Sequence, residues 1–339
     1  MAILEPWVLL RLIAGLISAT LFVRASLTSA RVLRFFNLAR ASEGQLALER
    51  RLELARTFVR VGAAVQIAQL ALTALAADKL SHSIRGAMCA YGVFAASPWG
   101  FRALAATVAA AVGAGLVLQL FSLEARVRDL SVARPLAIAT LLLTPLSIVD
   151  FALTANFLLG LDLGAVASCC STEIDAGIGA VTGYAEGPRI IATAGALGSV
   201  TVAAAAAWFV SRRPTAPRIV LSGALSALAL PLAIAAAVLE VAPYAFEAPH
   251  HTCPFCLLHA DVLGIGYPLF AGMFIATVST IGAALGALVA RSESGKIAVA
   301  SASPVALRRG AIAWAIVVMV GAAPIVRYAI VAHGAPLFR

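Results

Sequence analysis

The stretch HHTCPFCLLHADVLG, residues 250–264, gathers side chains that can carry out thiol or metal chemistry. A proline and a phenylalanine separate Cys253 from Cys256, and histidines stand on both sides of the pair. A thiolate can attack a disulfide or bind a soft metal ion, and imidazole is a common metal ligand. The spacing therefore leaves three interpretations open: a redox pair, a metal site, or a disulfide that only holds a loop.

A C-P-x-C sequence that opens a helix is typical of a redox pair. Proline is tolerated in the first helical turn, where its missing amide hydrogen has no intrahelical partner. The positive end of the helix dipole stabilises a thiolate, which is the species that attacks disulfides. The apolar run after Cys256 predicts that Cys253 and Cys256 lie at the beginning of a membrane span. A purely structural C-x-x-C disulfide would close a short ring and add little stability.

A soft-metal site is the alternative, because thiolates together with imidazoles suit copper(I), zinc or mercury. The adjacent residues Cys169 and Cys170 form a further thiol pair of this kind. The motif matches no closed zinc pattern, and Leu257 after Cys256 excludes the C-x-x-C-H attachment of c-type haem. This alternative predicts copper or mercury binding, transport or cofactor assembly, with the candidate ligands His250, His251, Cys253, Cys256 and His259.

The rest of the chain predicts a membrane protein. Of 339 residues, 62% are hydrophobic and only 12% are charged, about half the share usual in a soluble protein. The apolar residues form runs of about 20, the length that spans a bilayer as a helix. We therefore predict an all-α, polytopic transmembrane bundle of about eight spans, near residues 6–27, 58–77, 101–122, 135–160, 189–210, 218–243, 257–289 and 310–332.

The basic residues predict how the spans are oriented. Arginine and lysine concentrate after the first, third, fifth and seventh spans, and cytoplasmic loops carry such an excess. Both termini are then expected outside, and the net charge of +9 is explained without a nucleic-acid partner. The N-terminus has an early Glu5 and no basic n-region, so we expect the first span to be retained rather than cleaved as a signal peptide.

This orientation would bring every cysteine and histidine to the outer side. A bacterial inner membrane with its cysteine loops facing the periplasm fits this segregation, because disulfides form and persist in that compartment. The residues concerned are Cys89, Cys169, Cys170, Cys253, Cys256, His82, His250, His251, His259 and His333.

The segment CPFCLLHADVLG resembles the start of the fourth helix in bacterial members of the vitamin K epoxide reductase family. That family places a C-x-x-C at the outer end of its fourth span and a shuttle cysteine pair in an earlier outer loop. The same order occurs here, with ASCCSTEIDAG at residues 167–177 before the C-P-F-C motif. The resemblance covers residues 135–290 and divides the chain into regions 1–134, 135–290 and 291–339.

The resemblance implies a thiol oxidoreductase. Cys256 would face a quinone, ubiquinone or menaquinone, and Cys253 would exchange with the shuttle pair. Cys169 or Cys170 would accept electrons from a periplasmic thioredoxin-like protein or from substrate thiols. The chain departs from the family in that these two cysteines are adjacent and no thioredoxin domain is fused. Cys89 has no counterpart in this scheme.

Other polar residues extend this expectation. Asp150 lies in the middle of a span, where a charge is costly and usually functional. Asp150 is a candidate to relay a proton or contact the quinone, together with His259 and Asp261. Alternatively, Asp150 is hydrated through a cavity. Asp261, for its part, could simply compensate the dipole at the start of its helix. Arg11 and Arg327 are expected to extend their charged ends toward the membrane surface.

Two features of organisation remain. Residues 30–56 interleave arginines and glutamates at helical spacing, so we expect two spans to continue into the cytoplasm as a solvated hairpin. Each half of the chain also has a loop with histidine and cysteine between its second and third spans, which raises the hypothesis of a duplication.

The alternatives to redox function are soft-metal handling and a role as an accessory membrane subunit.

Overall fold

The computed structural model describes residues 5–35, 43–87, 89–127, 131–164, 186–249, 251–335 and 337–338. These residues form helices joined by short connections, and they contain no strand. Cys169, Cys170 and His250 lie outside the described residues.

Eight helical segments among the described residues are long and apolar enough to cross a membrane. The chain is therefore a multi-pass membrane protein, and the predicted number of spans is confirmed. Helices suit this environment because they satisfy their backbone hydrogen bonds internally. The segments are Pro6–Phe35, Leu46–Ser81, Gly100–Glu124, Ala133–Leu159, Thr193–Arg212, Ala216–Phe246, Gly266–Val289 and Glu293–Val331.

The helices are longer than the apolar runs at several ends. Helix α1 (Pro6–Phe35) continues into the charged region 30–56, and α2 (Glu43–Ser81) begins there, so both helices extend beyond their apolar runs as expected. That this region is a hairpin in the cytoplasm stays a prediction. Helix α12 (Glu293–Val331) starts well before residue 310. The side of the membrane on which the termini lie stays a prediction.

The chain forms two compact units. Unit 1 comprises Met1–Arg85, Val93–Val166 and Leu285–Ala302. Unit 2 comprises Gly86–Gly92, Ala167–Ala284 and Ser303–Arg339. The sequence-based division at residues 134 and 290 rested on the resemblance, and these units do not test it.

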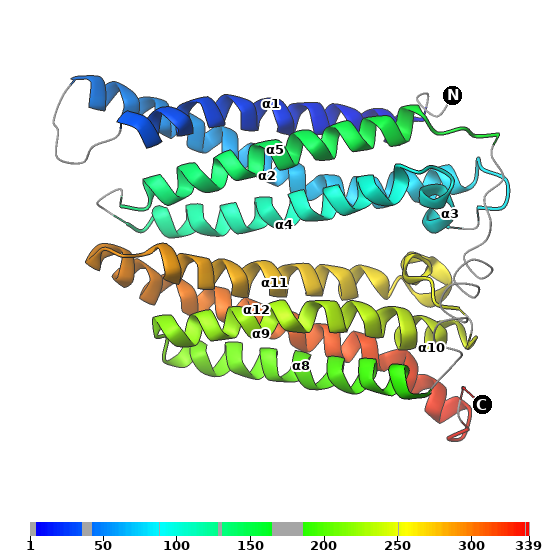
Figure 1. Cartoon of the computed structure of the whole chain (residues 1–339). Helices are drawn as coiled ribbons and strands as arrows, with labels where there is room; N and C mark the ends of the chain where they lie inside the picture. The colour runs from blue at the N-terminus through cyan, green and yellow to red at the C-terminus, as the bar shows by residue number, and fades with distance from the viewer. Residues whose placement is uncertain are drawn as a thin grey trace. The chain divides into compact units, whose positions relative to one another are not determined.

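Unit 1 is built around helices α1, α2, α4 (Gly100–Glu124) and α5 (Ala133–Leu159), which run alongside one another in Figure 1. Helix α1 packs on α2 and α5, and α4 also packs on both. Phe22, Val117, Phe121 and Leu136 belong to their shared apolar core. In the sequence, a short helix, α3 (Ala90–Ala95), lies between α2 and α4, and its first three residues belong to unit 2.

Unit 2 contains α8 (Glu186–Arg212) and α9 (Ala216–Ala236), followed by a π-helical segment, η3 (Ala237–Val241), and α10 (Ala242–Phe246). The other long helical stretches of this unit are the part of α11 (Gly266–Val289) up to Ala284 and the part of α12 from Ser303 onward. Leu257, Leu269 and Trp314 are fully or almost fully buried in its core.

A buried hydrogen bond in unit 2 yields a prediction about stability. Trp314 Nε1 donates to Ser226 Oγ over 3.0 Å, and both side chains are buried. Ser226→Ala removes the acceptor and leaves the indole N–H unsatisfied. We expect the free energy of unfolding to fall by about 1–3 kcal/mol. A denaturation series in detergent measures the change. Adding Trp314→Phe to Ser226→Ala removes the unsatisfied N–H as well, so the double variant should lose less stability than the sum of the two single variants.

Candidate thiol site

The C-P-F-C motif opens a short helix. Cys253 is extended, with φ −82° and ψ 112°, and Pro254 begins a 3-10 helix, η4 (Pro254–Leu258). This places Cys253 just before the helix and Cys256 within it. Proline fits at that first position because its nitrogen is not needed as a donor there.

The expectation that these cysteines begin the spanning helix directly is wrong. A second 3-10 helix, η5 (Ala260–Val262), follows η4, and α11 begins only at Gly266. The extended backbone of His259 interrupts the helix, and Leu263 and Gly264 have positive φ values of 56° and 60°. Glycine takes this conformation at no steric cost, so Gly264 assists the turn that leads into α11.

Cys89 joins the motif from a distant part of the sequence. It lies in Gly86–Gly92, which groups with unit 2 although its neighbours in sequence belong to unit 1. The Sγ atoms of Cys89 and Cys253 are 3.7 Å apart, and the Sγ atoms of Cys89, Cys253 and Cys256 all lie within 4.8 Å of one another. The structure therefore brings together three cysteines where the sequence predicted a pair.

The surroundings of the three sulfurs are apolar. Cys89, Cys253 and Cys256 are 0%, 1% and 8% exposed, so bulk water scarcely reaches them. Tyr91, Phe246 and Phe255 pack against this group. We call Cys89, Cys253 and Cys256 the cysteine cluster. Because the cluster is buried, only small or lipid-soluble reactants can reach it unless the surrounding loops open.

His251 lies near the cysteine cluster, because its ring packs on Phe246. Its ring lies 4.1 Å from that of Phe246, measured between centroids, and Phe246 packs against the cluster. Burial lowers the pKa of His251, the negative charge of Cys89 raises it, and His259 lowers it further. The buried Nε2 atom of His251 has no hydrogen-bond partner. The nitrogens of His251 do not belong to the group of ligating atoms that Cys89, Cys253 and Cys256 form.

The other residues predicted around the motif lie in different environments. The backbone N–H of His259 donates to the carbonyl oxygen of Cys256 over 3.0 Å, and its side chain is half-buried. Asp261 is exposed. These positions keep both as candidates for moving protons between thiols and water.

Asp150 belongs to unit 1, whereas the cysteine cluster belongs to unit 2. Its carboxylate is buried and pairs with the buried guanidinium of Arg11, with Nη2 2.9 Å from Oδ1 and 3.1 Å from Oδ2. Gln66, Thr107 and Thr154 also donate to it. The expectation that Arg11 extends toward the membrane surface is wrong, because its charge is compensated inside the helical unit.

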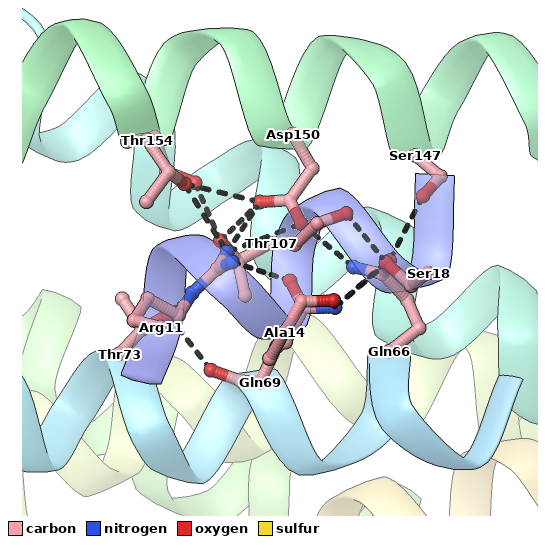
Figure 2. Close-up of polar contacts among 12 residues, drawn as sticks. Arg11, Ala14, Ser18, Gln66, Gln69, Thr73, Thr107, Ser147, Asp150 and Thr154 are labelled. Carbon is pink, nitrogen blue, oxygen red and sulfur yellow. Dashed lines mark hydrogen bonds and ion pairs between the residues drawn. The ribbon is translucent and has the colours of Figure 1, made fainter. Parts of the chain in front are cut away.

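Figure 2 shows how this buried polar network connects the helices of unit 1. Arg11 from α1 also donates to Thr73 and Gln69 of α2, and Ser18 and Ser147 donate to the side-chain oxygen of Gln66. The Asp150 oxygens thus accept from side chains of α1, α2, α4 and α5. The predicted role of Asp150 in relaying a proton or contacting a quinone stays a prediction.

Unit 2 has a buried carboxylate as well. Glu240 lies in the π-helical segment η3, with its Oε1 2.7 Å from Nε of Arg189 in α8. The guanidinium of Arg189 lies 3.5 Å from the centroid of the Phe338 ring. Single π-helical turns occur frequently at functional sites, but here the carboxylate already has a charged partner.

No family model, no curated protein and no solved structure matches the chain.

Proposed function

We propose that the chain is a membrane thiol–disulfide oxidoreductase that passes electrons from protein thiols to a quinone. The separation of 3.7 Å between the sulfurs of Cys89 and Cys253, with Cys256 within 4.8 Å of both, is the observation that carries the proposal. Three neighbouring thiols allow a disulfide to move from one pair to another, because exchange proceeds by attack of a thiolate on a disulfide sulfur.

Cys253 is the central residue of this exchange. A disulfide bond is about 2.05 Å long, so a bond between Cys89 and Cys253 requires the two sulfurs to approach by less than 2 Å. Cys253 also shares the C-x-x-C motif with Cys256. It can therefore form a disulfide with either neighbour and transfer the bond between them.

The overall reaction is balanced by a two-electron acceptor. Two thiols lose two electrons and two protons as their disulfide forms, and the quinone takes up both to become a quinol. Quinones are lipid-soluble, which suits a buried cysteine cluster in a multi-pass membrane protein. His259 and the exposed Asp261 would carry protons away from the thiols.

The resemblance to the vitamin K epoxide reductase family supports the same assignment of roles. Cys256 would face the quinone, and Cys253 would exchange with Cys169 or Cys170, which in turn would receive electrons from a periplasmic thioredoxin-like protein or substrate thiols. Cys89 adds a third thiol beside Cys253. In this proposal the protein resides in a bacterial inner membrane with its cysteine loops facing the periplasm, and both termini lie outside.

Thiol trapping tests this proposal. The full chain is reduced anaerobically with a strong chelator present, mixed with ubiquinone or menaquinone, and alkylated. We expect quinone to remove alkylatable thiols in pairs. Cys253→Ser is expected to abolish the loss within the cysteine cluster, whereas Cys89→Ser, the matched control, keeps the pair Cys253–Cys256. If quinone leaves all five thiols reduced, the proposal fails.

A further inference from the structure

We propose that the reduced cysteine cluster also forms a binding site for a soft d10 cation, Cu(I) or Zn²⁺, with Cys89 as a ligand from outside the C-P-F-C motif. This site differs from the one expected from sequence, which drew its ligands only from residues 250–259. It does not rest on the proposed redox function, because it concerns the fully reduced thiols alone.

The sulfur separations match those of a metal site. A metal–sulfur distance of about 2.3 Å at tetrahedral angles places neighbouring sulfurs about 3.8 Å apart. The 3.7 Å between Cys89 and Cys253 agrees with this value. The third sulfur lies within 4.8 Å of both, so a small movement of Cys256 completes the arrangement.

The chemistry of the donors selects the class of ion. Among the described residues, the group of convergent metal-ligating atoms consists of these thiols, and no carboxylate oxygen belongs to it. Thiolates favour Cu(I) and zinc, whereas magnesium, calcium and manganese favour oxygen ligands. The apolar side chains of Tyr91, Phe246 and Phe255 also limit the entry of water that would compete for the ion.

His251 lies near the cysteine cluster but outside the group of convergent ligating atoms. A buried polar atom without a hydrogen-bond partner calls for a physical explanation, and an ion is one such explanation. Its Nε2 atom is unpartnered, and its ring contacts Phe246 beside the cysteine cluster. The three convergent sulfurs suffice for trigonal Cu(I), whereas tetrahedral Zn²⁺ needs a fourth ligand in addition to them.

Metal binding and disulfide formation use the same sulfurs and therefore exclude one another. A disulfide between Cys89 and Cys253 removes two of the three thiolates. A bound ion, in turn, occupies the electron pairs with which a thiolate attacks a disulfide. The reduced protein should consequently bind the ion, and the oxidised protein should not.

Anaerobic competition titrations with Cu(I) and Zn²⁺ test the site on the reduced full chain, without quinone. We expect one ion per chain. Each of Cys89→Ser, Cys253→Ser and Cys256→Ser should weaken binding by more than about 100-fold, since losing even an outer-shell partner costs about 10–100-fold. His333→Ala, which removes an exposed imidazole, is the matched control and should change nothing.

X-ray absorption on the wild-type complex keeps the test independent of whether the variants fold. Three sulfur ligands at about 2.3 Å support the site. Failure of the reduced chain to bind either ion stoichiometrically would overturn it, as would fewer than three sulfur ligands or undiminished binding in Cys89→Ser. None of these outcomes bears on quinone-dependent thiol loss, which is measured separately with a chelator present.

Discussion

Asp150→Ala is expected to lower the free energy of unfolding of the protein by about 3–5 kcal/mol, because it leaves the buried charge of Arg11 without its counter-ion. The carboxylate also accepts hydrogen bonds from Gln66, Thr107 and Thr154, and these donors would lose an acceptor together. A denaturation series in mixed micelles, followed by tryptophan fluorescence, measures the loss.

Two matched variants separate this effect from a general loss of charge. Asp162→Ala removes an exposed carboxylate of the same unit and should change the free energy by no more than about 0.5 kcal/mol. The double variant Arg11→Met/Asp150→Leu removes both charges and should recover much of the stability, since apolar replacement of a buried pair is often neutral. A double variant as unstable as Asp150→Ala would contradict charge compensation as the role of the pair.

Cys253→Ser is expected to lower the rate of quinone reduction by about three orders of magnitude or more, as the loss of a catalytic nucleophile typically does. The proposed exchange requires Cys253 for both disulfides, one with Cys89 and one with Cys256. A hydroxyl in its place cannot form either bond. Quinol formation under single-turnover conditions, with reduced protein as the only electron donor, measures the change.

Cys89→Ser distinguishes a thiol relay from a simple C-x-x-C pair. This variant keeps Cys253 and Cys256, so it should still reduce one equivalent of quinone through that pair. The disulfide that links the segment around residue 89 to the motif should be lost. Equal activity and equal disulfide content in wild type and Cys89→Ser would remove Cys89 from the mechanism.

The membrane-spanning helices could be predicted from the sequence because each is encoded locally by its own apolar run. Their ends were harder to place. The apolar run after Cys256 predicted that helix α11 starts near residue 257, but the positive φ values of Leu263 and Gly264 delay it to Gly266. The full lengths of α1, α2 and α12 could not be predicted from hydropathy, because each helix continues beyond its apolar run into a segment with charged residues.

The cysteine cluster was predictable only in part. The spacing of Cys253 and Cys256 is visible in the sequence, but Cys89 lies 164 residues before Cys253, and nothing local links the two. Arg11 and Asp150 are 139 residues apart, and each alone indicated only a costly charge. Their pairing depends on the packing of α1 against α5, which the sequence of neither helix specifies by itself.

Disulfide mapping tests the central claim most directly. The reduced full chain is oxidised with one equivalent of quinone, alkylated, digested without reduction and examined by mass spectrometry. We predict peptides in which Cys253 is linked to Cys89 or to Cys256. Oxidation that leaves Cys253 alkylated in every peptide, with any disulfide confined to other cysteines, would contradict the claim that this cluster is the redox centre.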